Sequence, residues 1–184
     1  MSNNFFTIDE IPKGSLLEKY SEKASKTVQS KELLPFLKDV FLDCLKFLIQ
    51  KTNTEFLPQI TLKLVHTHEQ FEKIEKREFE KAKSDEIAKY PTRAFVIHNK
   101  FMAEVYVDVE FFISLINKGY PTFMFVLIHA YMNEILHILF PKKIEQEIYD
   151  LQCPFLETFL GIKLSKETKN LNLSNYYSQN PNHR

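Results

Sequence analysis

An apolar segment, Phe123-Met-Phe-Val-Leu-Ile-His-Ala-Tyr-Met-Asn-Glu-Ile-Leu-His-Ile-Leu-Phe140, follows Pro121 and ends at Pro141. Proline is tolerated in the first turn of a helix but cannot continue one, so the two prolines bound a long apolar helix. Four polar or ionisable side chains interrupt its middle, and such groups are costly at bilayer depth. They are His129, Asn133, Glu134 and His137. We therefore predict a buried core helix and expect no membrane partner.

The segments around this helix predict a small sheet covered by helices. Apolar residues at three- and four-residue spacing indicate helices, and alternating ones indicate strands. The expected elements are helix 30–50, strand 60–66, charged helix 67–89, a hairpin of strands 94–98 and 103–109, helix 111–117 capped by Asp108, helix 121–140, and helix 143–160 with a bend or restart at Pro154. This order predicts an α+β domain, dominated by helices, with a small mixed sheet.

Length and composition indicate one globular domain. The chain has 184 residues, 44% of them hydrophobic and 26% charged, and only 3 are glycine, so Gly-rich phosphate loops are not expected. We divide it into a lead-in with a short helix (1–29), the domain itself (30–163), and an Asn-rich polar tail (164–184) expected to be disordered. Basic and acidic residues number 24 each, so no net charge attracts nucleic acid, and we expect no nucleic-acid partner.

Cysteine usage and the N-terminal sequence predict a cytoplasmic protein. Cys44 and Cys153 lack Cys-x-x-Cys spacing and lie in apolar helical sequence, which is typical of buried thiols in a reducing compartment. The first residues have no basic segment followed by an apolar one, so no signal peptide is expected.

The long helix carries most of a metal-binding motif. A His-Glu-x-x-His zinc site needs two imidazoles one helical turn apart and a Glu beside the first as general base. The segment Asn133-Glu-Ile-Leu-His137 supplies the Glu and the second His but has Asn at the first position. Asn is a weaker zinc ligand than imidazole. His129 lies two turns, about 12 Å, before His137 and cannot share a metal with it.

With its preceding strands and short helix, this segment resembles the small zinc metallopeptidase domains of the zincin fold. The resemblance covers about residues 30–160 and is specific only at Glu134 and His137. It implies zinc as cofactor, held by His137, a downstream carboxylate and Asn133, with Glu134 as the catalytic base. It also implies that the strand around 105–107 pairs with an extended peptide substrate.

The carboxylate expected from the resemblance would come from the helix after Pro141. The apolar face of that helix is marked by Ile144, Ile148, Leu151 and Phe155. Glu147 flanks this face most closely, Asp150 lies farther from it and Glu145 lies on the opposite side. Glu147 is therefore the predicted third ligand, with Asp150 second.

Two functions follow from these residues. The first is a metal-dependent peptidase or its catalytically impaired relative; the alternative is a non-catalytic module that binds a peptide or protein through the cleft or the helix 67–89. The sequence gives no oligomeric state.

Two further pairs have functional spacing. His66 and His68 could chelate a metal, although Thr67 as a helix cap is the simpler interpretation. Arg93 and His98 have the spacing of an Arg-x4-His ribonuclease motif but lie in strand sequence, so we set that motif aside.

Overall fold

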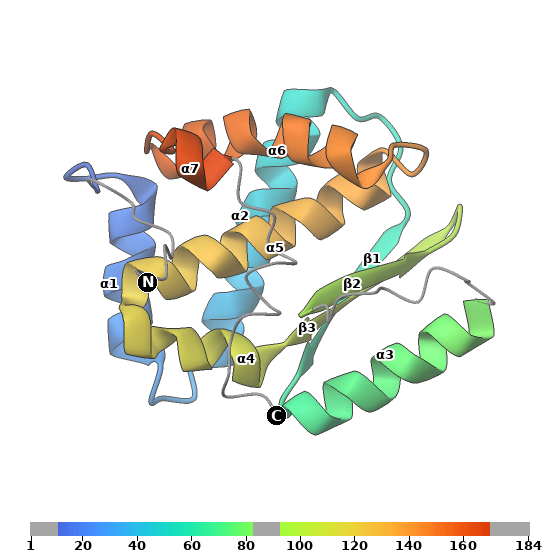
Figure 1. The fold of residues 1–184 in the computed structure, drawn as a ribbon, viewed down its shortest axis with the longest axis horizontal. Helices are drawn as coiled ribbons and strands as arrows, with labels where there is room; N and C mark the ends of the chain where they lie inside the picture. Colours follow the sequence, from blue (N-terminus) through green and yellow to red (C-terminus); the bar gives the residue numbers. More distant parts are fainter. Residues whose placement is uncertain (1–10, 83–92, 170–184) are drawn as a thin grey trace.

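A computed structural model describes residues 11–82 and 93–169 of the chain. Its elements are α1 (Leu16–Thr27), α2 (Leu33–Thr52), β1 (Gln59–Val65), α3 (His68–Ala82), β2 (Ala94–His98), β3 (Met102–Asp108), α4 (Val109–Ser114), the 3-10 helix η1 (Leu115–Lys118), α5 (Tyr120–Leu139), α6 (Glu145–Leu160) and α7 (Lys166–Lys169). Helices dominate and a three-stranded mixed sheet lies among them (Figure 1). The predicted α+β fold class is confirmed.

The strands are ordered β1-β3-β2, with β1 parallel and β2 antiparallel to β3. The predicted hairpin is present, because the N–H of Asn99 donates to the carbonyl of Met102 at 2.8 Å. β3 therefore has a neighbouring strand on each side. The expectation that the strand around 105–107 pairs with a peptide is wrong, because both of its edges are already used.

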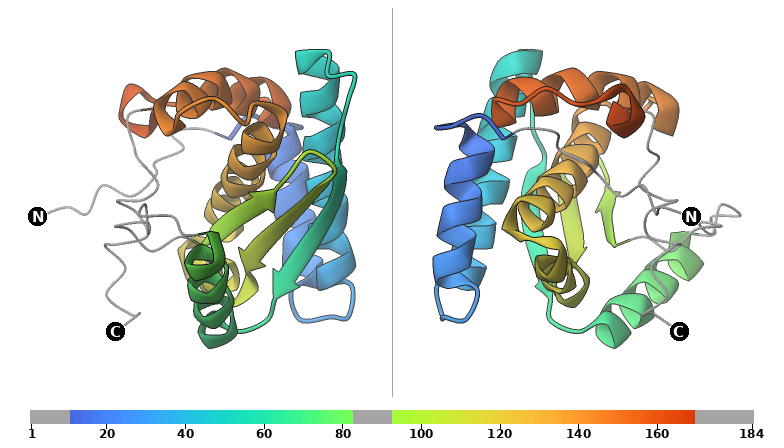
Figure 2. Two further views of the ribbon diagram at one scale, coloured as in Figure 1. Left: turned by 90° about the vertical axis from the view of Figure 1, so that its right-hand side faces the viewer. Right: turned by 60° about the vertical axis from the view of Figure 1, so that its left-hand side comes forward.

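Each face of the sheet packs against different helices. Ala103, Val105 and Val107 of β3 belong to the main core, beneath α1, α2, α5 and α6. On the other face, Tyr106 packs in a smaller cluster with Phe71 of α3. Figure 2 shows α3 on the face of the sheet opposite to the other long helices. The alternation of the strand sequence sets this two-sided arrangement.

The helix α5 forms the buried centre of the domain. Tyr131 of α5 is fully buried, packs edge-to-face on Phe41 and donates its hydroxyl to the carbonyl of Leu37. In the described part of the chain, α5 is the one helix long and apolar enough to cross a membrane, and 78% of its apolar window is buried in the domain. Such burial fits a core helix of a soluble protein.

Several predicted boundaries change. α3 is described only to Ala82, and the rest of the predicted helix lies outside the described residues. α6 continues through Pro154 as one helix. The helix α7 occupies part of the segment expected to be a disordered tail, while residues 170–184 lie outside the described chain. Cys44 and Cys153 are free thiols.

Candidate functional site

Glu145, the first residue of α6, joins the two ends of the motif on α5. Its Oε2 lies 2.9 Å from Nε2 of His137, and its Oε1 accepts a hydrogen bond of 3.2 Å from Nδ2 of Asn133. The side chain of His137 is 24% exposed and that of Glu145 is 53% exposed. One carboxylate therefore contacts both positions at which the motif places imidazoles.

The structure places Glu145, rather than the predicted Glu147 or Asp150, beside His137. Glu147 faces away: it accepts from the backbone N–H of Ile144 and pairs with Lys143 at 3.2 Å. Asp150 accepts from Gln146 instead. The helical-face argument pointed elsewhere because it counted Ile144 as part of the apolar face, whereas Ile144 precedes α6 and is 67% exposed. Glu145 lies on the face of α6 that is buried, which carries Ile148, Gln152, Leu156 and Leu160.

Glu134 lies buried against the edge of the sheet. α5 packs along β2, where alternate residues turn their backbone groups away from β3, because Asn99 bonds inward to Met102. Val96 is one of the outward residues, and its N–H bonds to the Glu134 carboxylate. Burial raises the pKa of Glu134 to about 7, although the charge of His137 and the Val96 N–H oppose the shift.

The charge of His137 on α5 affects the pKa values of Glu145 on α6 and of His98 on β2. Burial opposes protonation of His137, but the hydrogen bond to Glu145 and the charges of Glu134 and Glu145 together raise its pKa. Burial acts against ionisation of Glu145, but its bonds to His137 and Asn133 lower its pKa. Burial, and then the charge of His137, lower the pKa of His98. The site therefore favours an imidazolium–carboxylate pair beside a neutral imidazole.

A buried amide continues the site into the core. Gln152 of α6 is fully buried, and its Oε1 accepts from Nδ2 of Asn133 at 3.3 Å. Its Nε2 donates to the carbonyl of His129 and lies 3.0 Å from that residue's Nδ1. Burial lowers the pKa of His129 to about 3, so this imidazole is neutral. Gln152 thus orients the side-chain amide of Asn133, so that the N–H groups of Asn133 point at the side-chain oxygens of Gln152 and Glu145.

These residues do not fit a catalytic zinc site. Such sites take three protein ligands, normally imidazole, thiolate or carboxylate. Here one imidazole and one carboxylate are in contact, and the third position presents the N–H side of an amide to that carboxylate. Within the described ranges, no group of three His, Cys, Asp or Glu side chains is placed to hold a metal.

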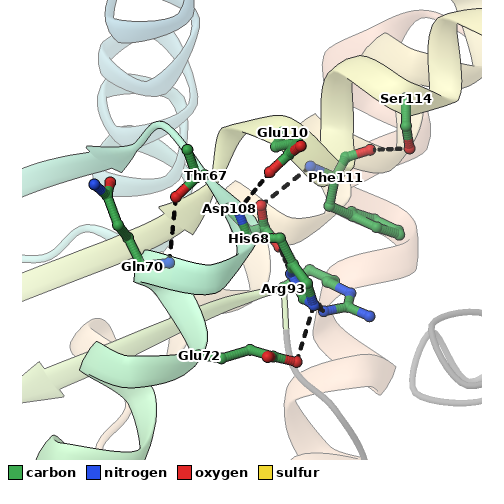
Figure 3. A network of polar contacts seen from close by, with 9 residues as sticks. All are labelled: Thr67, His68, Gln70, Glu72, Arg93, Asp108, Glu110, Phe111 and Ser114. Atoms are coloured by element: carbon green, nitrogen blue, oxygen red, sulfur yellow. Dashed lines mark hydrogen bonds and ion pairs between the residues drawn. The ribbon is translucent and has the colours of Figure 1, made fainter. Parts of the chain in front are cut away.

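A second polar cluster lies at the opposite end of the sheet, where β3 ends (Figure 3). Asp108 is fully buried and caps α4 by accepting from the N–H of Phe111. Its other oxygen lies 2.5 Å from Nδ1 of His68, whose Nε2 lies 2.9 Å from Glu72. Both ring nitrogens of His68 thus contact carboxylates, and its backbone N–H donates to Glu110.

Arg93 completes this cluster. Its guanidinium is buried, with Nη1 at 3.1 Å from both ring nitrogens of His68 and 3.8 Å from Asp108, and it lies over the ring of Phe111. In the part of the chain that is described, its Nε has no hydrogen-bond partner. The cluster ties together the starts of α3, β2 and α4.

The sequence did not predict that the residues of this second cluster lie together. The sequence drew attention to His68, Arg93 and Asp108 separately, as a possible ligand, a discounted motif member and a helix cap. Thr67 does cap α3, accepting from Gln70 at 3.3 Å. Arg93 precedes β2 and His98 ends it, so the strand separates the Arg-x4-His pair. Only strand register, which pairs Val65 with Asp108, shows that the three residues meet.

None of three comparisons with known proteins finds a match: the chain matches no family model, no curated protein and no solved structure. Its chemistry must be argued from its own residues.

Proposed function

We propose that this chain is a catalytically impaired relative of the zincin-type metallopeptidases, which binds peptide or protein segments without hydrolysing them. In this proposal the hydrogen-bonded set Asn133, Glu145 and His137 occupies the place of the metal site. The motif spacing and the position of Glu145 support a common origin with such enzymes. The donor chemistry at Asn133 supports the loss of activity.

The observation that carries the proposal is the double contact of Glu145. A carboxylate from the following helix that reaches both motif positions on α5 is the arrangement expected if a metal once joined all three. The Asn133 amide now supplies N–H donors where a cation would sit. A structural polar pair would need only the contact between Glu145 and His137.

The position of Glu134 also favours binding over catalysis. A general base must reach the proton that it removes, directly or through one water. Glu134 is 8% exposed, and its carboxylate bonds to the backbone of Val96 in β2. As the chain stands, Glu134 holds α5 to the sheet edge and is not directed at a substrate.

The test is the zinc content of protein purified without chelators, measured by plasma mass spectrometry. We expect little zinc in the parent and near-stoichiometric zinc in Asn133→His. In that background, Glu145→Ala should remove the zinc, whereas Glu147→Ala, a matched carboxylate on the same turn, should not.

Two results would overturn the proposal. Near-stoichiometric zinc in the parent that His137→Ala abolishes, together with peptide hydrolysis that Glu134→Gln abolishes, would make the protein an active peptidase. Absence of zinc from a folded Asn133→His variant would mean that the motif is not a lost metal site.

We also place the protein in the cytoplasm. The free thiols Cys44 and Cys153 and the burial of α5 support this location. Fractionation of the cell of origin, with detection of the protein by antibody, tests it.

A further inference from the structure

Exposed apolar side chains gather beside the site. The described residues include six exposed large apolar side chains, and five lie at the end of the molecule that carries His98 and His137. These five, the hairpin-end patch, are Phe56, Ile97, Phe101, Met102 and Ile144. Phe101 is 70% exposed, and Ile144 and Phe56 are nearly as open at 67% and 65%. Exposed apolar groups that gather in one patch, unlike scattered ones, mark a surface that another molecule covers.

Three separate segments bring the patch together. The backbone N–H of Gln59 donates to the carbonyl of Phe101 at 2.8 Å, which places the connection before β1 against the hairpin. Ile144 immediately precedes Glu145, whose partner His137 acts electrostatically on His98 of the same hairpin. The left panel of Figure 2 shows the hairpin, the connection from α2 to β1 and the connection from α5 to α6 side by side at one end.

The free charges around the patch are mainly positive. Lys100 contacts only the ring of Phe101 at 5.7 Å, and Lys142 has no carboxylate partner among the described residues. The carboxylates here are mostly engaged: Glu104 with Lys63, Glu145 with His137 and Glu147 with Lys143. Beside the patch, Glu55 is an exposed carboxylate with no ion pair among the described residues. A partner with negative charge beside its apolar groups fits this balance.

We propose that the hairpin-end patch docks an acidic segment of a partner protein that carries large apolar side chains. This inference rests on the proposed function, because it names where and what the impaired domain binds. Carboxylates of the segment pair with Lys100 and Lys142, and its apolar side chains cover Phe101 and Ile144.

A protein segment fits this surface better than a bilayer does. Polar groups of His98, His137 and Glu145 lie among the apolar residues and remain partly exposed. A lipid surface would remove water from these groups without replacing their hydrogen bonds, whereas a peptide backbone can replace them.

The test selects binders from a phage-displayed random peptide library on the full-length protein. We expect enriched sequences that combine Asp or Glu with aromatic or aliphatic residues. Synthetic peptides of these sequences should bind roughly tenfold more weakly to Phe101→Ser, as expected for an anchor residue, and to Lys100→Glu/Lys142→Glu. Leu42→Ser, at an apolar position on α2 that is 46% exposed, and Lys38→Glu are control variants that should bind like the parent.

Several results would overturn this inference. They are enrichment of basic or purely polar peptides, no enrichment, or binding that Phe101→Ser leaves unchanged. Flotation with phosphatidylserine vesicles that depends on Phe101 would assign the patch to membranes, and a dimer in light scattering that Phe101→Ser dissociates would assign it to a second copy. A zinc-loaded, active parent would instead refute the proposed function, and the zinc measurement detects that separately.

Discussion

Carboxylates hold two histidines of this molecule at opposite ends of one sheet, in different surroundings. His68 contacts Asp108, which is fully buried, and both lie against the buried Arg93. His137 contacts Glu145, which is 53% exposed. A buried charge left unpaired is strongly destabilising, whereas an exposed ion pair contributes about 1 kcal/mol or less. Breaking the first cluster is therefore expected to be strongly destabilising, whereas breaking the contact of His137 with Glu145 is expected to cost little.

The difference separates structural from functional polar groups. The contacts of Asp108 with His68, Arg93 and the start of α4 join elements that meet only in the folded state, so a structural role explains the cluster. The contacts of His137 join two consecutive helices near the surface and are surrounded by exposed apolar side chains. Stability does not explain that arrangement, and the binding role that we propose would account for it.

The largest effect is expected at Asp108. Asp108→Ala removes the cap of α4 and leaves Arg93 and His68 without their buried carboxylate, so we expect a loss of roughly 3–5 kcal/mol in the free energy of unfolding. Urea denaturation followed by circular dichroism measures it. Glu110→Ala, which removes an exposed carboxylate beside the same histidine, is the control and should lose about 1 kcal/mol or less. Equal losses in the two variants would show that the buried cluster is not the stabilising unit.

The second effect depends on pH and concerns Glu134. Burial raises its pKa from an ordinary 4.5 to about 7, so the folded state binds more protons than the unfolded state between these values. Stability from this group is therefore present at low pH and is lost as pH rises toward 7, by on the order of 3 kcal/mol. Glu134→Gln cannot ionise, so its stability should match the parent near pH 4 and exceed it at pH 8.

Denaturation of both proteins across this pH range measures the difference. His137, Glu145 and His98 titrate in both proteins, so most of their contribution cancels in the difference. Parallel stability profiles for the two proteins would show that the carboxylate of Glu134 is not buried in the folded state.

A smaller effect is expected at Asn133. Asn133→Ala removes hydrogen bonds to Glu145 and to the buried Gln152, so roughly 1–2 kcal/mol should be lost. Thermal or urea unfolding measures it, with the exposed Asn117→Ala as control. A loss of stability as large as that of Asp108→Ala would mean that the two polar clusters contribute equally to the free energy of unfolding.

The sequence predicted individual helices and strands more readily than the contacts between them. Periodicity identified α5, the hairpin and the Asp108 cap, because each depends on local spacing. It could not show that β3 is central, since strand order depends on how distant segments pair. The same limit hid the contact of His68 with Arg93. Glu145 was rejected because the helical wheel counted the exposed Ile144 as part of the apolar face of α6.

The smallest predicted effect decides which carboxylate belongs to the site. Glu145→Gln should lower the pKa of His137, because it removes the negative charge and replaces the charged hydrogen-bond acceptor with a neutral one. Glu147→Gln should leave that pKa unchanged, since Glu147 bonds to Ile144 and Lys143 instead. Titration of the imidazole resonances by NMR measures both variants. Equal shifts would mean that neither carboxylate is specific to His137, and the likeness to a metal site would then rest on sequence spacing alone. A shift confined to Glu145→Gln would set His137 apart from His68, whose two nitrogens contact two different carboxylates and which no single replacement would leave unpaired.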